Sequence, residues 1–118
     1  MFNVNVIAVN PQKTEQKTIP VEVLVDTGSE LTWLPKSILA QAEITPIRKR
    51  NFQTVTKQQI QQDVGYAILR IEDFETIDEV VFAEDSDMNL LGLRTLEGFG
   101  VTADNIGHRF ISQIALVV

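Results

Sequence analysis

One carboxylate in the chain stands where a side chain can do acid–base chemistry. Asp26 directly follows the apolar run Val21–Val25 and precedes Thr27, Gly28 and Ser29. The run predicts a strand that ends at the carboxylate, and glycine lets the backbone bend sharply or approach another group closely. The sequence therefore predicts a carboxylate in a tight turn with hydroxyl side chains beside it. An ordinary strand-ending turn is the alternative, because Asp, Thr, Gly and Ser are all favoured in turns.

Residues 21–35 resemble the active-site turn of aspartic peptidases, in the order hydrophobic strand, Asp-Thr-Gly-Ser, second hydrophobic strand. Trp33, Leu34 and Pro35 stand at the spacing at which pepsin-like enzymes carry Trp, an aliphatic residue and Pro after the same turn. Because short motifs such as Asp-Thr-Gly also occur by chance, these additional matches favour the resemblance over an unrelated turn.

A second family element comes late in the chain. In retropepsin-like proteins a pair of hydrophobic residues and a glycine precede a short helix. Here Leu90, Leu91 and Gly92 stand in that order, and a helix stop is predicted at Gly98 or Gly100. With both elements present, the resemblance covers nearly the whole chain.

The resemblance implies that residues 1–118 form one mostly β domain. This would be a retropepsin-like (acid protease) β-barrel with one short helix in its C-terminal half, closed into a symmetric homodimer. The sequence pattern agrees in part, because alternating apolar and polar residues are typical of half-buried strands. A helical turn is expected over residues 37–42, with Ser37 near its N-cap. The predicted strands span residues 2–9, 18–25, 31–35, 52–56, 60–71, 79–83 and 109–118.

Aspartic peptidase chemistry needs two carboxyl groups that share one proton, because like charges about 3 Å apart cannot both ionise. The ionised carboxyl activates a water against the scissile carbonyl, and the neutral one hydrogen-bonds the developing oxyanion. One chain supplies half of such a site, so an enzyme must bring two copies of Asp26 together across a twofold axis. The aspartates that lack a following Ser/Thr-Gly are Asp63, Asp73, Asp78, Asp85, Asp87 and Asp104.

The residues around Asp26 have expected roles. The backbone N–H of Gly28 can approach the carboxylate, and Ser29 can donate a hydrogen bond to its outer oxygen. By resemblance, Thr27 points away and locks the two turns to each other across the dimer. Trp33 either sits under the substrate-covering hairpin or fills the core. The residues expected to pack behind the turn and hold it still are Leu90, Leu91 and Gly92.

The substrate-covering hairpin of the family, the flap, is expected between residues 52 and 66, with its tip near Lys57, Gln58 and Gln59. Family flaps usually carry glycine at or near the tip, and pepsin-like flaps also present a tyrosine. The one tyrosine of this chain and the nearest glycine lie well along the returning strand. A tip without either can still form a hairpin loop of three to five residues.

Composition excludes several function classes. The 118 residues include no cysteine and a single histidine, His108, so no disulfide or thiolate metal site can form, and no metal or cofactor is expected. The formal net charge of −6 argues against a nucleic-acid partner. No signal peptide and no apolar run of membrane-spanning length are found, so the expectation is a cytoplasmic protein without a membrane partner.

One short basic cluster, Arg48-Lys49-Arg50, interrupts the acidic composition. Short charge runs usually decorate exposed faces, so a solvated strand edge or loop is the first interpretation. The second is functional, because the cluster lies near the expected flap and can favour acidic peptides.

Two functions of different classes follow. The first is a homodimeric aspartic endopeptidase acting on peptide or protein substrates through two Asp26 carboxyls. The second is a retropepsin-like dimerisation or peptide-binding module with little or no hydrolysis. The intact Asp-Thr-Gly-Ser turn favours the first, and the unorthodox flap tip favours the second. The apolar C-terminus is expected to pair, together with the N-terminal strand, in the dimer.

Overall fold

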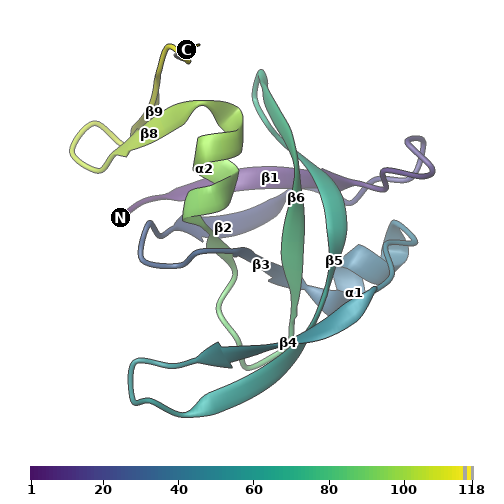
Figure 1. Ribbon diagram of the computed structural model, residues 1–118. Coiled ribbons are helices and arrows are strands. Elements are labelled where there is room, and N and C mark those ends of the chain that lie inside the picture. Colours follow the sequence, from purple (N-terminus) through teal and green to yellow (C-terminus); the bar gives the residue numbers. More distant parts are fainter. Residues whose placement is uncertain (116, 118) are drawn as a thin grey trace.

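The chain folds into one large sheet, a small hairpin sheet and two short helices, and a computed structural model describes residues 1–115 and 117 (Figure 1). The mostly β prediction is confirmed. The elements in chain order are β1 (Asn3–Val9), β2 (Val21–Val25), β3 (Thr32–Pro35), α1 (Lys36–Gln41), β4 (Arg48–Gln53), β5 (Gln59–Ile71), β6 (Phe74–Ala83), β7 (Leu90–Leu91), α2 (Leu93–Phe99), β8 (Val101–Asp104) and β9 (Arg109–Ser112).

The large sheet has the strand order β1-β2-β7-β3-β6-β5-β4, and β1 also pairs with β5. This second pairing joins Ile7–Val9 to the far half of β5, so the sheet curls back on itself. The parallel pairs are β2 with β7 and β3 with β6. The turn between β2 and β3 therefore lies beside the late segment that contains β7.

Alternation along the strands sets which side chains reach the core. In β2, Val21, Val23 and Val25 are buried and the residues between them are not, which is the period-two pattern of a strand with one buried face. Leu69 of β5 and Leu96 of α2 belong to the same buried cluster. Helix α2 thus packs its apolar side onto the sheet from which the candidate site projects.

Several predicted boundaries were wrong. The second strand begins at Val21 rather than at residue 18, and Pro20 just before it has no N–H to donate to a ladder. Helix α1 begins at Lys36 with Pro35 as its N-cap residue and no side-chain cap, so the predicted cap at Ser37 is wrong. Helix α2 is the short helix that the resemblance implied in the C-terminal half, and α1 corresponds to the helical turn predicted over 37–42, one residue earlier.

The later strands also differ from the prediction. The strand predicted over 52–56 is β4, which begins at Arg48 and takes in the basic cluster. The strand predicted over 79–83 begins at Phe74, because the whole of 74–81 pairs with β5. The strand predicted over 109–118 ends at Ser112 and pairs with β8; Leu116 and Val118 lie outside the described residues. Neither helix of the described chain is long and apolar enough to cross a membrane.

Candidate active site

Strand β2 delivers Asp26 into a turn whose backbone is fixed while its carboxylate stays accessible. The N–H of Asp26 donates to the carbonyl of Leu91 at 2.9 Å, which continues the pairing of β2 with β7 by one residue. The N–H of Gly28 donates to Asp26 Oδ1 at 2.9 Å, and the Asp26 side chain remains partly exposed. A Cβ at position 28 would lie 3.1 Å from that same oxygen, so glycine gives the carboxylate room. The predicted approach of Gly28 is present in the structure.

Helix α2 holds the turn from behind. The first four N–H groups of a helix have no partner within it. Here the N–H of Leu93 donates to the carbonyl of Ser29 at 2.8 Å, and that of Arg94 donates to the carbonyl of Glu30 at 3.1 Å. A Cβ on Gly92 would lie 2.4 Å from the carbonyl oxygen of Leu31, so a larger residue does not fit. The segment 90–92 packs behind the turn, as the sequence predicts, with Leu91 fully buried and Leu90 partly exposed.

The two hydroxyl residues of the turn lie differently from each other. Ser29 Oγ donates to the carbonyl of Leu31 at 2.7 Å and not to Asp26, so that expected hydrogen bond is wrong for this chain. Serine hydroxyls often bond nearby backbone carbonyls, and this local bond removes the donor from the carboxylate. Thr27 is exposed, and its expected role in locking two turns together stays a prediction.

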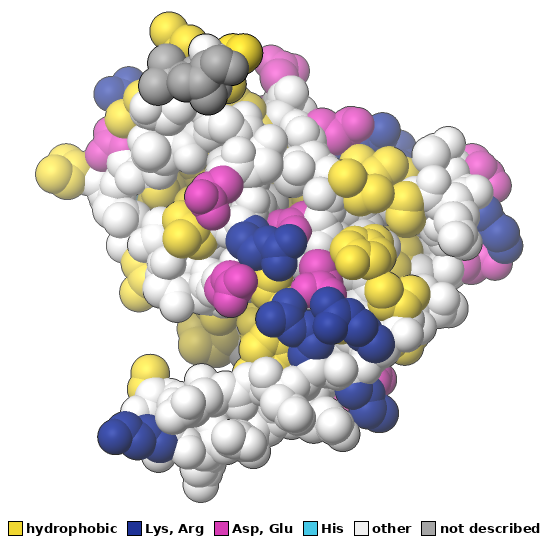
Figure 2. Space-filling view, in the orientation of Figure 1, with side chains coloured by type: hydrophobic (Ala, Val, Ile, Leu, Met, Phe, Trp, Pro, Cys, Tyr) yellow, Lys and Arg dark blue, Asp and Glu magenta, His cyan; other side chains and the backbone are white. Residues whose placement is uncertain are grey.

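The hairpin predicted to be the flap consists of β4 and β5, and in the space-filling view it is an arm separated from the body by a hollow (Figure 2). Its loop is closed by the N–H of Thr54 donating to the carbonyl of Gln58 at 2.8 Å and the N–H of Lys57 donating to the carbonyl of Thr54 at 2.9 Å. The tip is therefore 55–57, two residues before the predicted one, and Gln59 already belongs to β5. Lys57 adopts a φ of 64°, a left-handed conformation that three-residue loops require at this place.

Trp33 lies beneath the flap rather than in the main core. Its ring centroid is 5.4 Å from that of Phe52, which is a residue of flap strand β4. Both rings pack against a small separate cluster of Leu31, Val64 and Val81. Of the two interpretations offered by the sequence, the structure has the one that places the indole under the flap.

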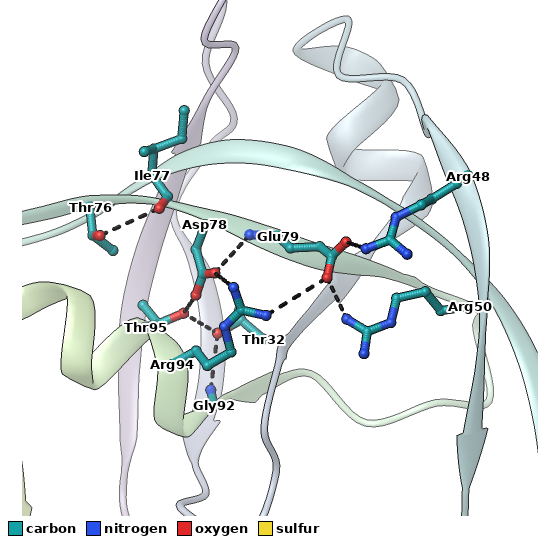
Figure 3. Close-up of polar contacts among 10 residues, drawn as sticks. All are labelled: Thr32, Arg48, Arg50, Thr76, Ile77, Asp78, Glu79, Gly92, Arg94 and Thr95. Atoms are coloured by element: carbon teal, nitrogen blue, oxygen red, sulfur yellow. Dashed lines mark hydrogen bonds and ion pairs between the residues drawn. The ribbon is translucent and has the colours of Figure 1, made fainter.

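Sequence reasoning missed a buried hydrogen-bond chain behind the turn (Figure 3). The N–H of Gly92 donates to Thr32 Oγ1 at 3.0 Å, Thr32 and Thr95 hydroxyls lie 2.6 Å apart, and Thr95 Oγ1 donates to Asp78 Oδ2 at 2.9 Å. Because the Thr95 proton goes to the carboxylate, Thr32 must donate to Thr95, so each hydroxyl both accepts and donates. The signal available in the sequence was an aspartate close to the apolar run 80–83, where a carboxylate is expensive to bury without donors.

The basic cluster of β4 is not an unpaired charged patch. Arg48 and Arg50 both bond Glu79, and Lys49 Nζ lies 2.9 Å from Asp63 Oδ1. The interpretation as a solvated edge is only partly right, because two of the three cations share one buried carboxylate. This pairing also weakens the idea that the cluster attracts acidic peptides.

Within the described residues, no group of three or more metal-binding side chains lies together.

Comparison with known proteins agrees with this geometry. The family described as "gag-polyprotein putative aspartyl protease" matches residues 13–98, a stretch that contains Asp26, the flap and the segment 90–92. No curated protein sequence matches this chain.

Two solved structures share the fold. The solution structure of simian foamy virus (mac) protease is similar with a TM-score of 0.54 and 21% identity, over 81% of this chain and 92% of the viral one. A foamy viral protease–reverse transcriptase, solved in complex with double-stranded DNA, is similar with a TM-score of 0.53 and 19% identity, over 80% of this chain and 15% of that one. Since the family match spans well over half of the sequence, this chain belongs to the gag-polyprotein family of retroviral-type, retropepsin-like aspartyl proteases.

Proposed function

We propose that this chain is an aspartic endopeptidase that acts as a homodimer, with one Asp26 carboxyl from each protomer. The observation that carries the proposal is the setting of Asp26. Its carboxylate is partly exposed, accepts the Gly28 N–H at 2.9 Å and sits on a backbone fixed by Leu91. The sequence contains one Asp-Thr-Gly, so a second copy must supply the second carboxyl.

The proposed reaction uses the two carboxyls in different protonation states. With like charges in contact, one carboxyl keeps a proton while the other is ionised. The ionised group takes a proton from a water, which attacks the scissile carbonyl, and the neutral group hydrogen-bonds the oxyanion that develops. Gly28 keeps the orientation of each Asp26, and the two α2 N–H groups keep each turn in place. The carboxyls themselves activate the water, so this reaction requires no cofactor.

The proposed dimer assembles through the terminal strands. Strand β9 pairs with β8 and, within the described residues, with no other strand, so one of its edges is unpaired. Near that edge Ile111 is exposed, and Ile114 and Val117 are almost fully exposed. Unpaired edges with apolar side chains favour pairing with another chain. A symmetric dimer that covers β9 and β1 is consistent with these features.

Asp26→Asn tests the chemistry, because it keeps the shape of the side chain and removes its charge and proton. Hydrolysis of a denatured protein at mildly acidic pH should fall by about three orders of magnitude or more. Sedimentation and circular dichroism should remain those of wild type. Asp73→Asn, in the turn between β5 and β6, is the matched control and should retain activity. Unchanged cleavage by Asp26→Asn would contradict the assignment.

A second candidate, a peptide-binding module with little hydrolysis, is favoured by one observation. The flap tip has Lys57 in the left-handed conformation where glycine costs less. Pepstatin-like statines, whose hydroxyl mimics the tetrahedral intermediate, separate the two functions. Tight statine binding with turnover supports the enzyme, and peptide binding without turnover supports the module.

A further inference from the structure

Glu79 of β6 is a buried carboxylate outside the candidate site. Its side chain is 3% exposed, and both of its oxygens accept hydrogen bonds from guanidinium groups. Arg48 Nη2 donates to Oε2, and Arg50 Nη1 donates to Oε1 at 2.5 Å (Figure 3). A buried carboxylate is costly unless it is paired and hydrogen-bonded, so the position of Glu79 depends on these arginines.

The partners of Glu79 come from two elements, the hairpin strand β4 and the helix α2. Arg48 and Arg50 belong to flap strand β4. Arg94 belongs to α2, and its guanidinium lies 3.9 Å from Glu79 and 3.9 Å from Asp78. The backbone N–H of the same Arg94 donates to the turn at Glu30. Glu79 therefore lies between the flap and the helix that holds the Asp26 turn.

The flap needs such an attachment because the sheet does not hold it along its length. Strand β5 pairs with β6 over 64–71 and with β4 over 59–64. On the tip side of Val64, the two strands of the flap therefore pair with each other and not with β6. Besides the ladder, the flap contacts the body through Trp33 with Phe52, through Gln62 Nε2, which donates to Asp87 Oδ2 at 3.3 Å, and through the arginines on Glu79. Of these, the arginines make the contact with a buried charged group at the root of the flap. Figure 2 shows Lys and Arg side chains gathered where the arm joins the body.

We propose that Glu79 is a positioning residue that clamps the root of the flap and so keeps β4 down over the Asp26 turn. With the clamp intact, Phe52 stays on Trp33 and the flap is closed. Without the negative charge, Arg48 and Arg50 lose their shared partner, turn to solvent and release β4. The catalytic consequence of the clamp rests on the proposed function, whereas the position of the flap does not.

Trp33 gives a direct readout, because it is the single tryptophan of the chain and lies under the flap. In Glu79→Gln, acrylamide quenching of Trp33 should increase by about twofold or more, with a red-shifted emission, because the flap opens locally. Glu75→Gln is the matched control. Glu75 lies on the same strand and also pairs with an arginine, since Arg70 Nε is 2.5 Å from its Oε2, but it pairs at the far end from the flap. Its Trp33 quenching should equal that of wild type.

Kinetics give the second readout. An open flap loses binding to substrate, so Glu79→Gln should raise KM for a peptide by about tenfold while kcat changes less. Arg48→Gln should change KM in the same direction. The double variant Glu79→Gln/Arg48→Gln should be no worse than Glu79→Gln alone, because both changes break one interaction.

Each outcome decides the proposal. Wild-type quenching in a folded Glu79→Gln overturns it, and so does an equal increase in Glu75→Gln. If Glu79→Gln fails to fold, Arg48→Gln decides, because its side chain is half-exposed and its removal leaves Arg50 on Glu79. Increased Trp33 quenching in Arg48→Gln then supports the clamp, and unchanged quenching overturns it. A wild type that binds peptide but does not hydrolyse it contradicts the proposed function and leaves the quenching test valid.

Discussion

At Asp26 the main chain and the side chain have opposite environments. The backbone is bonded to Leu91 and backed by α2, while the carboxylate is partly exposed and accepts one N–H, from Gly28. A fixed backbone limits the positions that the carboxylate can occupy, and an accessible carboxylate can meet a water and a second carboxyl. Both properties are needed for a half-site that is completed by a partner.

Ser29→Ala tests the hydrogen bond that differs from expectation. The hydroxyl donates to Leu31, so its loss should lower the free energy of unfolding by about 1 kcal/mol. The acidic limb of the pH–activity profile should stay where it is, because the hydroxyl does not touch Asp26. Urea unfolding and the pH profile measure the two effects, with Ser37→Ala on the exposed side of α1 as control. A shift of the acidic limb would mean that the hydroxyl turns to Asp26 when the dimer forms.

Thr95→Val tests the buried hydrogen-bond chain. Valine has the shape of threonine, but it leaves Thr32 without an acceptor and Asp78 Oδ2 without its donor. Unsatisfied buried polar groups are costly, so the free energy of unfolding should fall by about 1–3 kcal/mol. Thr102→Val, at an exposed strand position, is the control and should be nearly neutral. Equal urea midpoints for the two variants would show that the buried hydrogen bonds of Thr95 contribute nothing to the free energy of unfolding.

The elements around the site divide into those that local sequence predicts and those that it does not. The turn, β2 and the segment 90–92 follow from hydrophobic runs and glycine, because their neighbours in sequence decide their conformation. The pairing of Arg48 and Arg50 with Glu79 joins residues about thirty positions apart, and no local pattern indicates it. The start of α1 was missed for a different, local reason: β3 runs directly into α1, so the helix begins without the side-chain cap that marks a helix start in a sequence.

The flap tip gives a prediction at the scale of an element. Lys57 adopts a φ of 64°, and a left-handed conformation costs a residue with a Cβ about 1–2 kcal/mol. Lys57→Gly should therefore stabilise the loop and slow amide hydrogen exchange at positions 54 and 57, because the N–H groups of these two residues close the loop. Thr56→Gly, at a residue without positive φ, is the control and should speed exchange. Faster exchange in Lys57→Gly would contradict this account of the tip.

At the scale of the whole molecule, the described residues contain one candidate catalytic turn, one hairpin predicted to be the flap and, at β9, one unpaired strand edge. The sequence predicts the half-site directly, because it contains a single Asp-Thr-Gly. The contacts of a second copy cannot be derived from one chain's pattern, since they depend on two surfaces that meet only in the assembly. Association of two chains is therefore the step on which the proposed activity depends.

Co-refolding wild type with Asp26→Asn at constant total concentration tests that dependence. If each active site needs two Asp26 carboxyls, mixed dimers are inactive and activity follows the square of the wild-type fraction. An equimolar mixture should then retain about a quarter of the activity of pure wild type, because random pairing gives that share of wild-type dimers. A mixture that retains about half, in proportion to the wild-type chains, would show that one chain suffices and would contradict the shared site.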